Sequence, residues 1–255
     1  MAVDFDERLE GTGYEETWSL GEVLGGGATL NEDTATSGIT GAPDNWDAQC
    51  GVWTYVAAQN CYVGDVNVLI PNEAIVYARL EAIFSAESLA NNEQNAFILL
   101  VGDDGAAVTV IFYLLQDGSG DLRVRVRDQR DATDNDTSSA IVAVDTPIVL
   151  ESLWDTTNDV VMAWVDGVEL VNASLTGAAA TRLTDTVIWG SSNSVTAAAE
   201  TVAMANLIIN NADGERVGTG RFLAGLQPIS GGVSTKTLNP SHALGGQLNG
   251  ALQAA

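Results

Sequence analysis

The side chains of this chain that could do chemistry are mostly carboxylates, because 34 acidic residues stand against 10 basic residues and one histidine. That histidine, His242, lies in a Gly- and Ser-rich stretch, so a serine or cysteine nucleophile with a histidine base is not expected. A zinc site needs several histidine or cysteine ligands, and the chain has one histidine and two cysteines. Carboxylate chemistry and oxygen-ligand metal binding are the remaining options.

Acidic turns are the candidates for metal binding. Asp103 and Asp104 precede a glycine, and Asp134 and Asp136 flank an asparagine. Calcium prefers carboxylate and carbonyl oxygens, which such turns can supply. Asp and Asn also favour turns without any metal, and none of these clusters has the spacing of an EF-hand. We therefore expect no cofactor and leave calcium as a possible ligand.

Several aromatic side chains could bind a sugar. Trp46 follows Asp44 and Asn45 in a polar loop, where an indole is difficult to explain as core, so it is the best candidate for an exposed stacking surface. Trp53 and Tyr55 lie on the same face of one expected strand and could extend that surface. Packing between the sheets is the alternative for both.

The segment 122–127 alternates apolar residues with arginines. Arg123, Arg125 and Arg127 therefore fall on one face of the expected strand. In a chain this acidic, one hypothesis is a docking stripe for an acidic neighbour. The alternative is an outer face whose arginines pair with Asp and Glu on adjacent strands.

The net charge of the chain limits the classes of partner that it can bind. A net charge of −24 repels phosphate backbones, so nucleic-acid binding is not expected. No apolar run reaches the length of a membrane span, and the N-terminus lacks the pattern of a secretory signal.

Cys50 and Cys61 could form a disulfide between neighbouring strands, or could be two buried thiols.

The elements that must position these side chains are short strands. Apolar runs alternate with Gly and Asp turns along most of the chain, a pattern typical of a β-sandwich or barrel. The expected strands are 52–58, 73–84, 96–101, 108–115, 122–127, 147–154, 160–165, 168–171, 187–190 and 202–209.

Three segments resemble the concanavalin A-like (laminin-G-like) family, as found in phage and environmental bacterial proteins. Residues 150–171 end one strand in an aromatic and an aspartate and carry a Val-Asp-Gly hairpin, and segments 186–190 and 202–210 are similar to the family's later strands. The resemblance implies an all-β, two-sheet antiparallel jelly-roll sandwich over residues 1–215. Asn206 stands where relatives often have an acidic residue, which weakens any transfer of their calcium site.

Residues 216–255 are predicted to form an extended C-terminal arm. Glycine and proline disfavour regular structure there, yet the apolar residues are too many for a solvated tail. The arm is expected to bind another subunit or a particle through Phe222, Leu226, Leu238, Leu244, Leu248 and Leu252.

These observations together predict a non-catalytic virion accessory protein, either a capsid decoration or a tail or fibre component. The expected location is the virion surface or the extracellular space. Its expected partners are other virion or surface proteins and further copies of the chain, with a surface glycan as a possible ligand. The alternative is a carbohydrate-binding module. A divergent glycoside hydrolase is less favoured, because the clustered carboxylate strand motif of the family's glucanases is missing.

Overall fold

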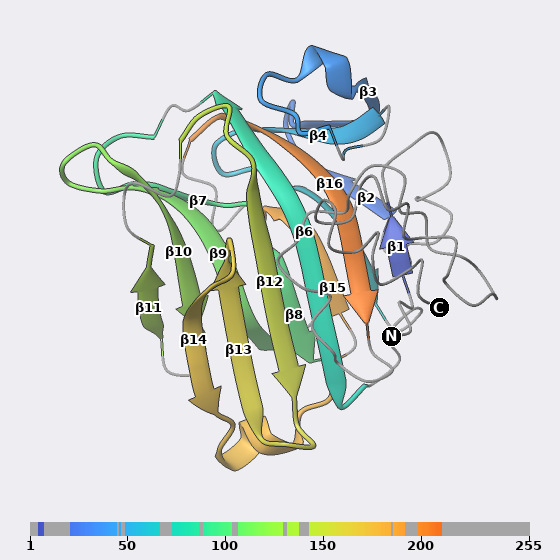
Figure 1. The fold of residues 1–255 in the computed structure, drawn as a ribbon, viewed down its shortest axis with the longest axis vertical. Helices are drawn as coiled ribbons and strands as arrows, with labels where there is room; N and C mark the ends of the chain where they lie inside the picture. The colour runs from blue at the N-terminus through green and yellow to red at the C-terminus, as the bar shows by residue number, and fades with distance from the viewer. Residues whose placement is uncertain are drawn as a thin grey trace, which may run out of the picture.

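The computed structural model describes residues 5–7, 21–44, 46, 49–66, 73–86, 89–103, 107–129, 132–137, 143–184, 186–191 and 198–210. Their strands form two eight-stranded antiparallel sheets, which lie one behind the other in Figure 1. The predicted two-sheet antiparallel sandwich is therefore confirmed. Helix in the described ranges is limited to the short 3-10 turns η1 (Thr36–Gly38) and η2 (Gly177–Thr181).

We call the first sheet the β6 sheet. In spatial order it contains β14 (Val168–Ser174), β13 (Val160–Val165), β12 (Ile148–Asp155), β6 (Ile75–Ala86), β16 (Glu200–Asn210), β4 (Gln49–Tyr55) and β3 (Thr29–Ala35), and β1 (Phe5–Glu7) pairs with β16.

The second sheet is the β10 sheet. Its order is β11 (Thr133–Asp136), β10 (Leu122–Asp128), β9 (Ala107–Gln116), β8 (Leu99–Asp103), β15 (Thr186–Ser191), β5 (Cys61–Val66) and β2 (Gly21–Leu24), and β7 (Gln94–Ala96) pairs with β9.

The core lies between the sheets and follows from strand alternation. On β6 every second residue enters the main apolar cluster, namely Val76, Ala78, Leu80, Ala82 and Phe84. The residues between them face the outer side of the sheet, as the period of two requires. Across the core, the rings of Phe84 and Phe97 meet edge to face with centroids 4.8 Å apart, a favoured aromatic geometry that joins the two sheets.

The predicted Val-Asp-Gly hairpin joins β13 to β14. Asp166 and Gly167 have φ values of 48° and 79°, and positive φ at both central residues is what a type I′ turn requires. Asp166 also ties the turn to β12: its Oδ1 accepts a 2.8 Å hydrogen bond from the backbone N–H of Val149. The hairpin is therefore held by the neighbouring strand as well as by its own turn geometry.

β16 lies between β6 and β4 within the β6 sheet and contains a β-bulge. The pairing register shifts between Ala205 and Ile208, and Asn206 has a φ of 54°. Along its other edge, β16 pairs with β4 over residues 200–204 and with β1 over residues 207–209. The bulge lies where the partner strand changes, and bulges commonly mark such breaks in a ladder.

Some sequence predictions differ from the structure, and others concern residues that it does not describe. Strands β2, β3, β5 and β11 were not expected. Residues 216–255, with Phe222, Leu226, Leu238, Leu244, Leu248 and Leu252, lie outside the described residues, so the arm stays a prediction. None of the helical turns in the described ranges is long or apolar enough to cross a bilayer.

The hypothesis of a disulfide between Cys50 and Cys61 is wrong. Cys50 and Cys61 are both buried thiols, and no disulfide joins them. Cys61 lies in the main core between the sheets, whereas Cys50 lies in a separate apolar cluster with Ile83 and Trp46. Ile83 alternates with the core residues of β6, so that cluster is on the outer side of the β6 sheet. The two thiols are therefore on opposite sides of a sheet, and a disulfide needs facing Cβ atoms.

The native protein should not react with a thiol reagent such as 5,5′-dithiobis(2-nitrobenzoate). Burial raises the pKa of the Cys50 thiol to about 12, and the thiolate is the nucleophile. Absorbance at 412 nm should report no titratable thiol in the native state and both thiols in denaturant. Rapid labelling of the folded protein would show that one of the cysteines is accessible.

Tyr55→Phe should leave stability unchanged or raise it by up to about 1 kcal/mol, because a buried hydroxyl without a partner costs free energy. The Tyr55 side chain is fully buried, and its hydroxyl has no hydrogen-bond partner among the described residues. The matched control is Tyr77→Phe, since the Tyr77 hydroxyl donates a 2.7 Å hydrogen bond to Glu151 Oε1. That change should cost about 1.5–3 kcal/mol in urea unfolding. Equal losses for both variants would argue against this reading of Tyr55.

Candidate functional site

Three arginines stand in a row on the outer face of the β10 sheet. In the strand register, Arg125 lies opposite Tyr113 of β9 and Asp136 of β11, and Arg127 lies opposite Asp134. Directly opposed residues share one face of a sheet, so these side chains form a single surface. We call it the arginine face; it consists of Gln94, Tyr113, Asp117, Arg123, Arg125, Arg127, Asp134 and Asp136.

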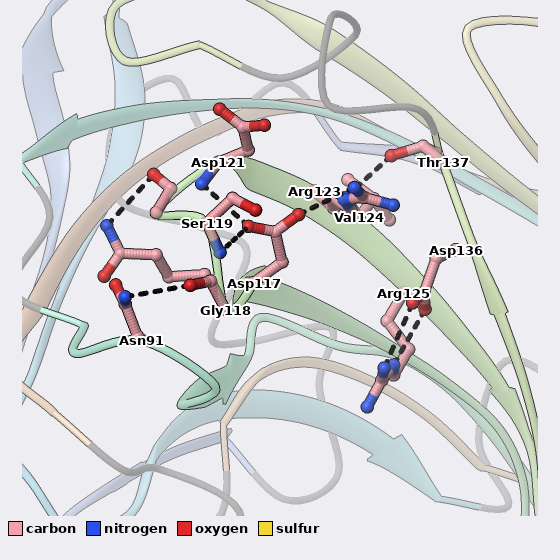
Figure 2. Close-up of polar contacts among 12 residues, drawn as sticks. Asn91, Asp117, Gly118, Ser119, Asp121, Arg123, Val124, Arg125, Asp136 and Thr137 are labelled. Atoms are coloured by element: carbon pink, nitrogen blue, oxygen red, sulfur yellow. Dashed lines mark hydrogen bonds and ion pairs between the residues drawn. The ribbon is translucent and has the colours of Figure 1, made fainter.

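Arg125 is the most tightly held member of the arginine face. Its Nε and Nη2 donate to the two carboxylate oxygens of Asp136 at 2.8 and 3.1 Å, the bidentate pair drawn in Figure 2. Its Nη1 reaches Gln94 Oε1 at 3.2 Å and Asp134 Oδ2 at 3.3 Å. The hydrogen bond to Asp136 raises the pKa of Arg125 above its ordinary value. The guanidinium plane is therefore fixed, because a bidentate pair sets orientation as well as distance.

Asp134 links two arginines. Its Oδ2 contacts Arg125, and its Oδ1 lies 3.2 Å from Nε of Arg127. The second contact is an ion pair without hydrogen-bond geometry, and Nε of Arg127 has no hydrogen-bond acceptor among the described residues. Arg127 also interacts with Tyr113: burial raises the pKa of Tyr113, and the arginine partly opposes that rise.

Asp117 fixes the third arginine from the turn between β9 and β10. Its Oδ1 accepts hydrogen bonds from the backbone N–H groups of Ser119 and Asp121, at 2.8 and 3.0 Å, and its Oδ2 lies 2.6 Å from Nη2 of Arg123 (Figure 2). The backbone hydrogen bond from Asp121 is the main cause that lowers the pKa of Asp117. Asn91, from a neighbouring turn, donates to the carbonyl of Gly118 at 3.2 Å.

The arginine face is partly open to solvent. The side chains of Arg123, Arg125 and Arg127 are 32%, 23% and 30% exposed. Beside them the same sheet holds a small buried apolar cluster of Ala96, Ile98, Ile111 and Tyr113, with Ile188 packed against it. The accessible part of the face is therefore its fixed donors and acceptors, which suit a ligand carrying hydroxyl groups.

The outer face of the β6 sheet carries a second polar group, but it is buried. Nε1 of Trp46 donates to Glu81 Oε2 at 2.7 Å, and Nη2 of Arg79 donates to Glu81 Oε1 at 2.8 Å. On the neighbouring strand Glu151 lies opposite Arg79 and accepts the hydrogen bond from Tyr77. Arg79, Glu81, Tyr77 and Glu151 are all 0% exposed. In this arrangement the network is not accessible to a ligand.

The sugar-stacking hypothesis for Trp46 and its neighbours is therefore wrong. Trp46 is 5% exposed because its indole covers Glu81 and packs with Ile83 and Cys50. Trp53 and Tyr55 point into the core between the sheets, since β4 turns that face inward. Asp44 is exposed, and Asn45 lies outside the described residues.

The calcium hypothesis also needs correction. Asp134 and Asp136 are committed to Arg125 and Arg127, whose charges take the place that a cation would occupy. Asp103 ends β8 opposite Ala107, and Asp104 lies outside the described residues. Across the ranges that the structure describes, no group of three or more histidine, cysteine or acidic side chains could hold a metal ion.

Sequence reasoning found the three arginines but missed their surroundings. It did not connect Tyr113 or Gln94 with Arg125, because those contacts depend on which strands become neighbours. The docking role assigned to the stripe stays a prediction, and the arginines do pair with acidic residues of β11 and of the β9–β10 turn. The strict alternation of 122–127 was the signal that identified this face.

Several solved structures of other proteins have a similar fold. No protein-family model matches the chain, and no curated protein matches it. Among solved structures it is similar to the "Cellulose induced protein, Cip1", with a TM-score of 0.55, 16% identity, and coverage of 85% of this chain and 100% of Cip1.

Two alginate lyases are also similar. A mutant of alginate lyase Aly36B in complex with an alginate tetrasaccharide has a TM-score of 0.50 and 10% identity, over 66% of this chain and 82% of the lyase. A family 7 alginate lyase in complex with substrate has a TM-score of 0.50 and 8% identity, over 66% and 80%. The chain therefore has the concanavalin A-like jelly-roll fold that its sequence predicted.

The same comparison overturns the prediction that the chain is not an enzyme. That prediction relied on the place of His242 in a Gly- and Ser-rich stretch and on a missing carboxylate motif, but enzymes are among the structures that share the fold. A missing motif of one enzyme class does not exclude another, because catalysis depends on the site and not on the fold.

Trp46→Phe should destabilise the protein by about 1–3 kcal/mol, because it removes a donor from a buried carboxylate. The matched control is Trp53→Phe: Nε1 of Trp53 has no hydrogen-bond partner among the described residues, so that change removes volume alone. Urea unfolding of both variants should show an added loss for Trp46→Phe beyond what its lost volume explains. An unchanged midpoint for Trp46→Phe would show that the indole is not tied to Glu81.

Proposed function

We propose that this chain is a glycan-binding domain whose ligand lies on the arginine face. The carrying observation is that Arg123, Arg125 and Arg127, three of only 10 basic residues, stand partly exposed on one strand face and are held there by aspartates. The chain concentrates its scarce donors on this surface. A surface with only a general solvating role does not require such a concentration.

The geometry suits sugars for a physical reason. A sugar hydroxyl both donates and accepts hydrogen bonds, and Arg–Asp pairs present donors and acceptors side by side. Because Arg125 is held by Asp136, Asp134 and Gln94, little side-chain entropy is lost when a ligand binds.

The fold supports the same proposal. Two alginate lyases that share it were solved with an alginate tetrasaccharide and with substrate, so this sandwich can accommodate an oligosaccharide. At 10% and 8% identity the likeness carries no residue roles to this chain. Whether a bound glycan is also cleaved is a separate question, and the assay below includes a measurement of turnover.

A glycan-binding domain fits the predicted extracellular location. The capsid or tail role and the predicted oligomer rest on residues 216–255, which lie outside the described residues. No similar structure named above supports a virion role, so that role stays a prediction. The carbohydrate-binding alternative drawn from the sequence is retained, but at a different surface from Trp46.

Arg125→Ala should weaken glycan binding by about tenfold or more, because hydrogen bonds to a charged group are worth about 1.5–3 kcal/mol. Affinity electrophoresis through a panel of polysaccharides would identify ligands, and calorimetry would give the dissociation constants. Reducing-end release and absorbance at 235 nm would report hydrolysis and lyase turnover.

The control is Arg182→Gln, which changes a partly buried arginine beyond η2 and outside the arginine face. It should bind as the unaltered chain does, and urea midpoints should confirm that both variants fold. The proposal fails if the unaltered chain binds no glycan, or if Arg125→Ala binds equally well.

A further inference from the structure

We infer that the arginine face selects uncharged, hydroxyl-rich glycans and discriminates against carboxylated polysaccharides. This inference rests on the proposed function and names the ligand class of the same surface. The proposed function states only that the arginine face binds a glycan. The inference states which glycans it accepts, because of the charges on the face and the hydrogen bonds that its arginines already make.

The first step is the charge of the surface. Arg123 is paired with Asp117, Arg125 with Asp136, and Asp134 lies between Arg125 and Arg127. Three positive charges therefore meet three negative charges, and the arginine face carries no net charge. A row of arginines in isolation would attract anions, but this row is neutralised where it stands.

The second step is the charge of the whole chain. A net charge of −24 sets up a negative field around the molecule, and the exposed side chain of Asp121 adds to it beside the β9–β10 turn. At physiological ionic strength such a field extends about 8 Å from the surface before salt screens it. A polyuronate approaching the arginine face therefore meets repulsion that an uncharged glycan does not.

The third step is that the best carboxylate site is already occupied. A ligand carboxylate binds arginine most strongly through a bidentate pair. On Arg125 that position holds Asp136, at 2.8 and 3.1 Å. Since Asp136 belongs to the same chain, its effective concentration beside Arg125 exceeds that of any dissolved ligand. Hydroxyl groups need no bidentate position and can use the remaining single donors and the aspartate oxygens.

Asp134 is the residue that sets this selectivity. Asp134 forms ion pairs with both Arg125 and Arg127, at 3.3 and 3.2 Å. Removing its charge gives the arginine face a net charge of +1 and frees Nη1 of Arg125 from one partner. Asp134→Asn should therefore admit carboxylated glycans while the bidentate pair with Asp136 continues to hold Arg125.

The test measures binding of the full chain to neutral polysaccharides, such as β-glucan and xyloglucan, and to alginate, a polyuronate. The unaltered chain should bind at least one neutral polysaccharide ten times more tightly than alginate. Asp134→Asn should bind alginate at least fivefold more tightly than the unaltered chain, and 0.5 M sodium chloride should abolish that gain. The control Asp121→Asn makes the same charge change at a side chain outside these ion pairs, and should show no comparable gain.

Two failures are distinguishable. If the unaltered chain binds alginate as tightly as any neutral polysaccharide, the inference is overturned while the proposed function stands. If it binds no polysaccharide at all, the proposed function fails and the inference falls with it. Should Asp134→Asn fail to fold, Asp136→Asn replaces it, because it adds the same charge to the arginine face. The inference is overturned if Asp136→Asn binds alginate no more tightly than the control Asp121→Asn does.

Discussion

The period of two in every strand is the constraint on which the rest of this structure depends. A strand between two layers must send alternate side chains into the core, so a register slip of one residue would exchange its two faces. On β10 the inward positions are Val124 and Val126, and the outward positions between them are arginines. Burying the valines fixes the arginines on the outer face, and the register with β11 then decides which carboxylates they meet.

The same constraint acts on β6 with a different result. Its inward residues fill the core, and its outward positions carry Arg79 and Glu81, which are fully buried. Buried ion pairs contribute little to net stability, but removing one partner is costly because the other charge stays in a dry environment. Trp46 and Glu81 are therefore tied together. The two outer faces of the sandwich consequently differ. The charges on the β6 sheet lie in a buried network, whereas the charges on the β10 sheet are partly exposed to solvent.

Local sequence was sufficient for the strands with strict alternation, including β6 and β10, for β16 despite its bulge, and for the hairpin at Asp166. It was insufficient where the outcome depends on distant partners. Trp46 follows polar residues, yet it is buried because Glu81, 35 positions away, accepts its hydrogen bond. Cys50 and Cys61 are near in sequence, but alternation put them on different faces. The arginines of the candidate site were predictable from spacing, whereas Gln94 and Tyr113 joined them only through the order of strands β7, β9 and β10.

The fold alone leaves function open, since alginate lyases share this sandwich and the chain keeps only 10% and 8% identity with them. What separates the possibilities is the chemistry of the accessible surface. On the β6 sheet the carboxylates of Glu81 and Glu151 are the groups suited to acid–base work, but they are enclosed. On the β10 sheet the accessible groups are guanidinium–carboxylate pairs, which bind and orient a ligand. The proposed glycan recognition therefore rests on the open surface, in a fold that is also found in enzymes.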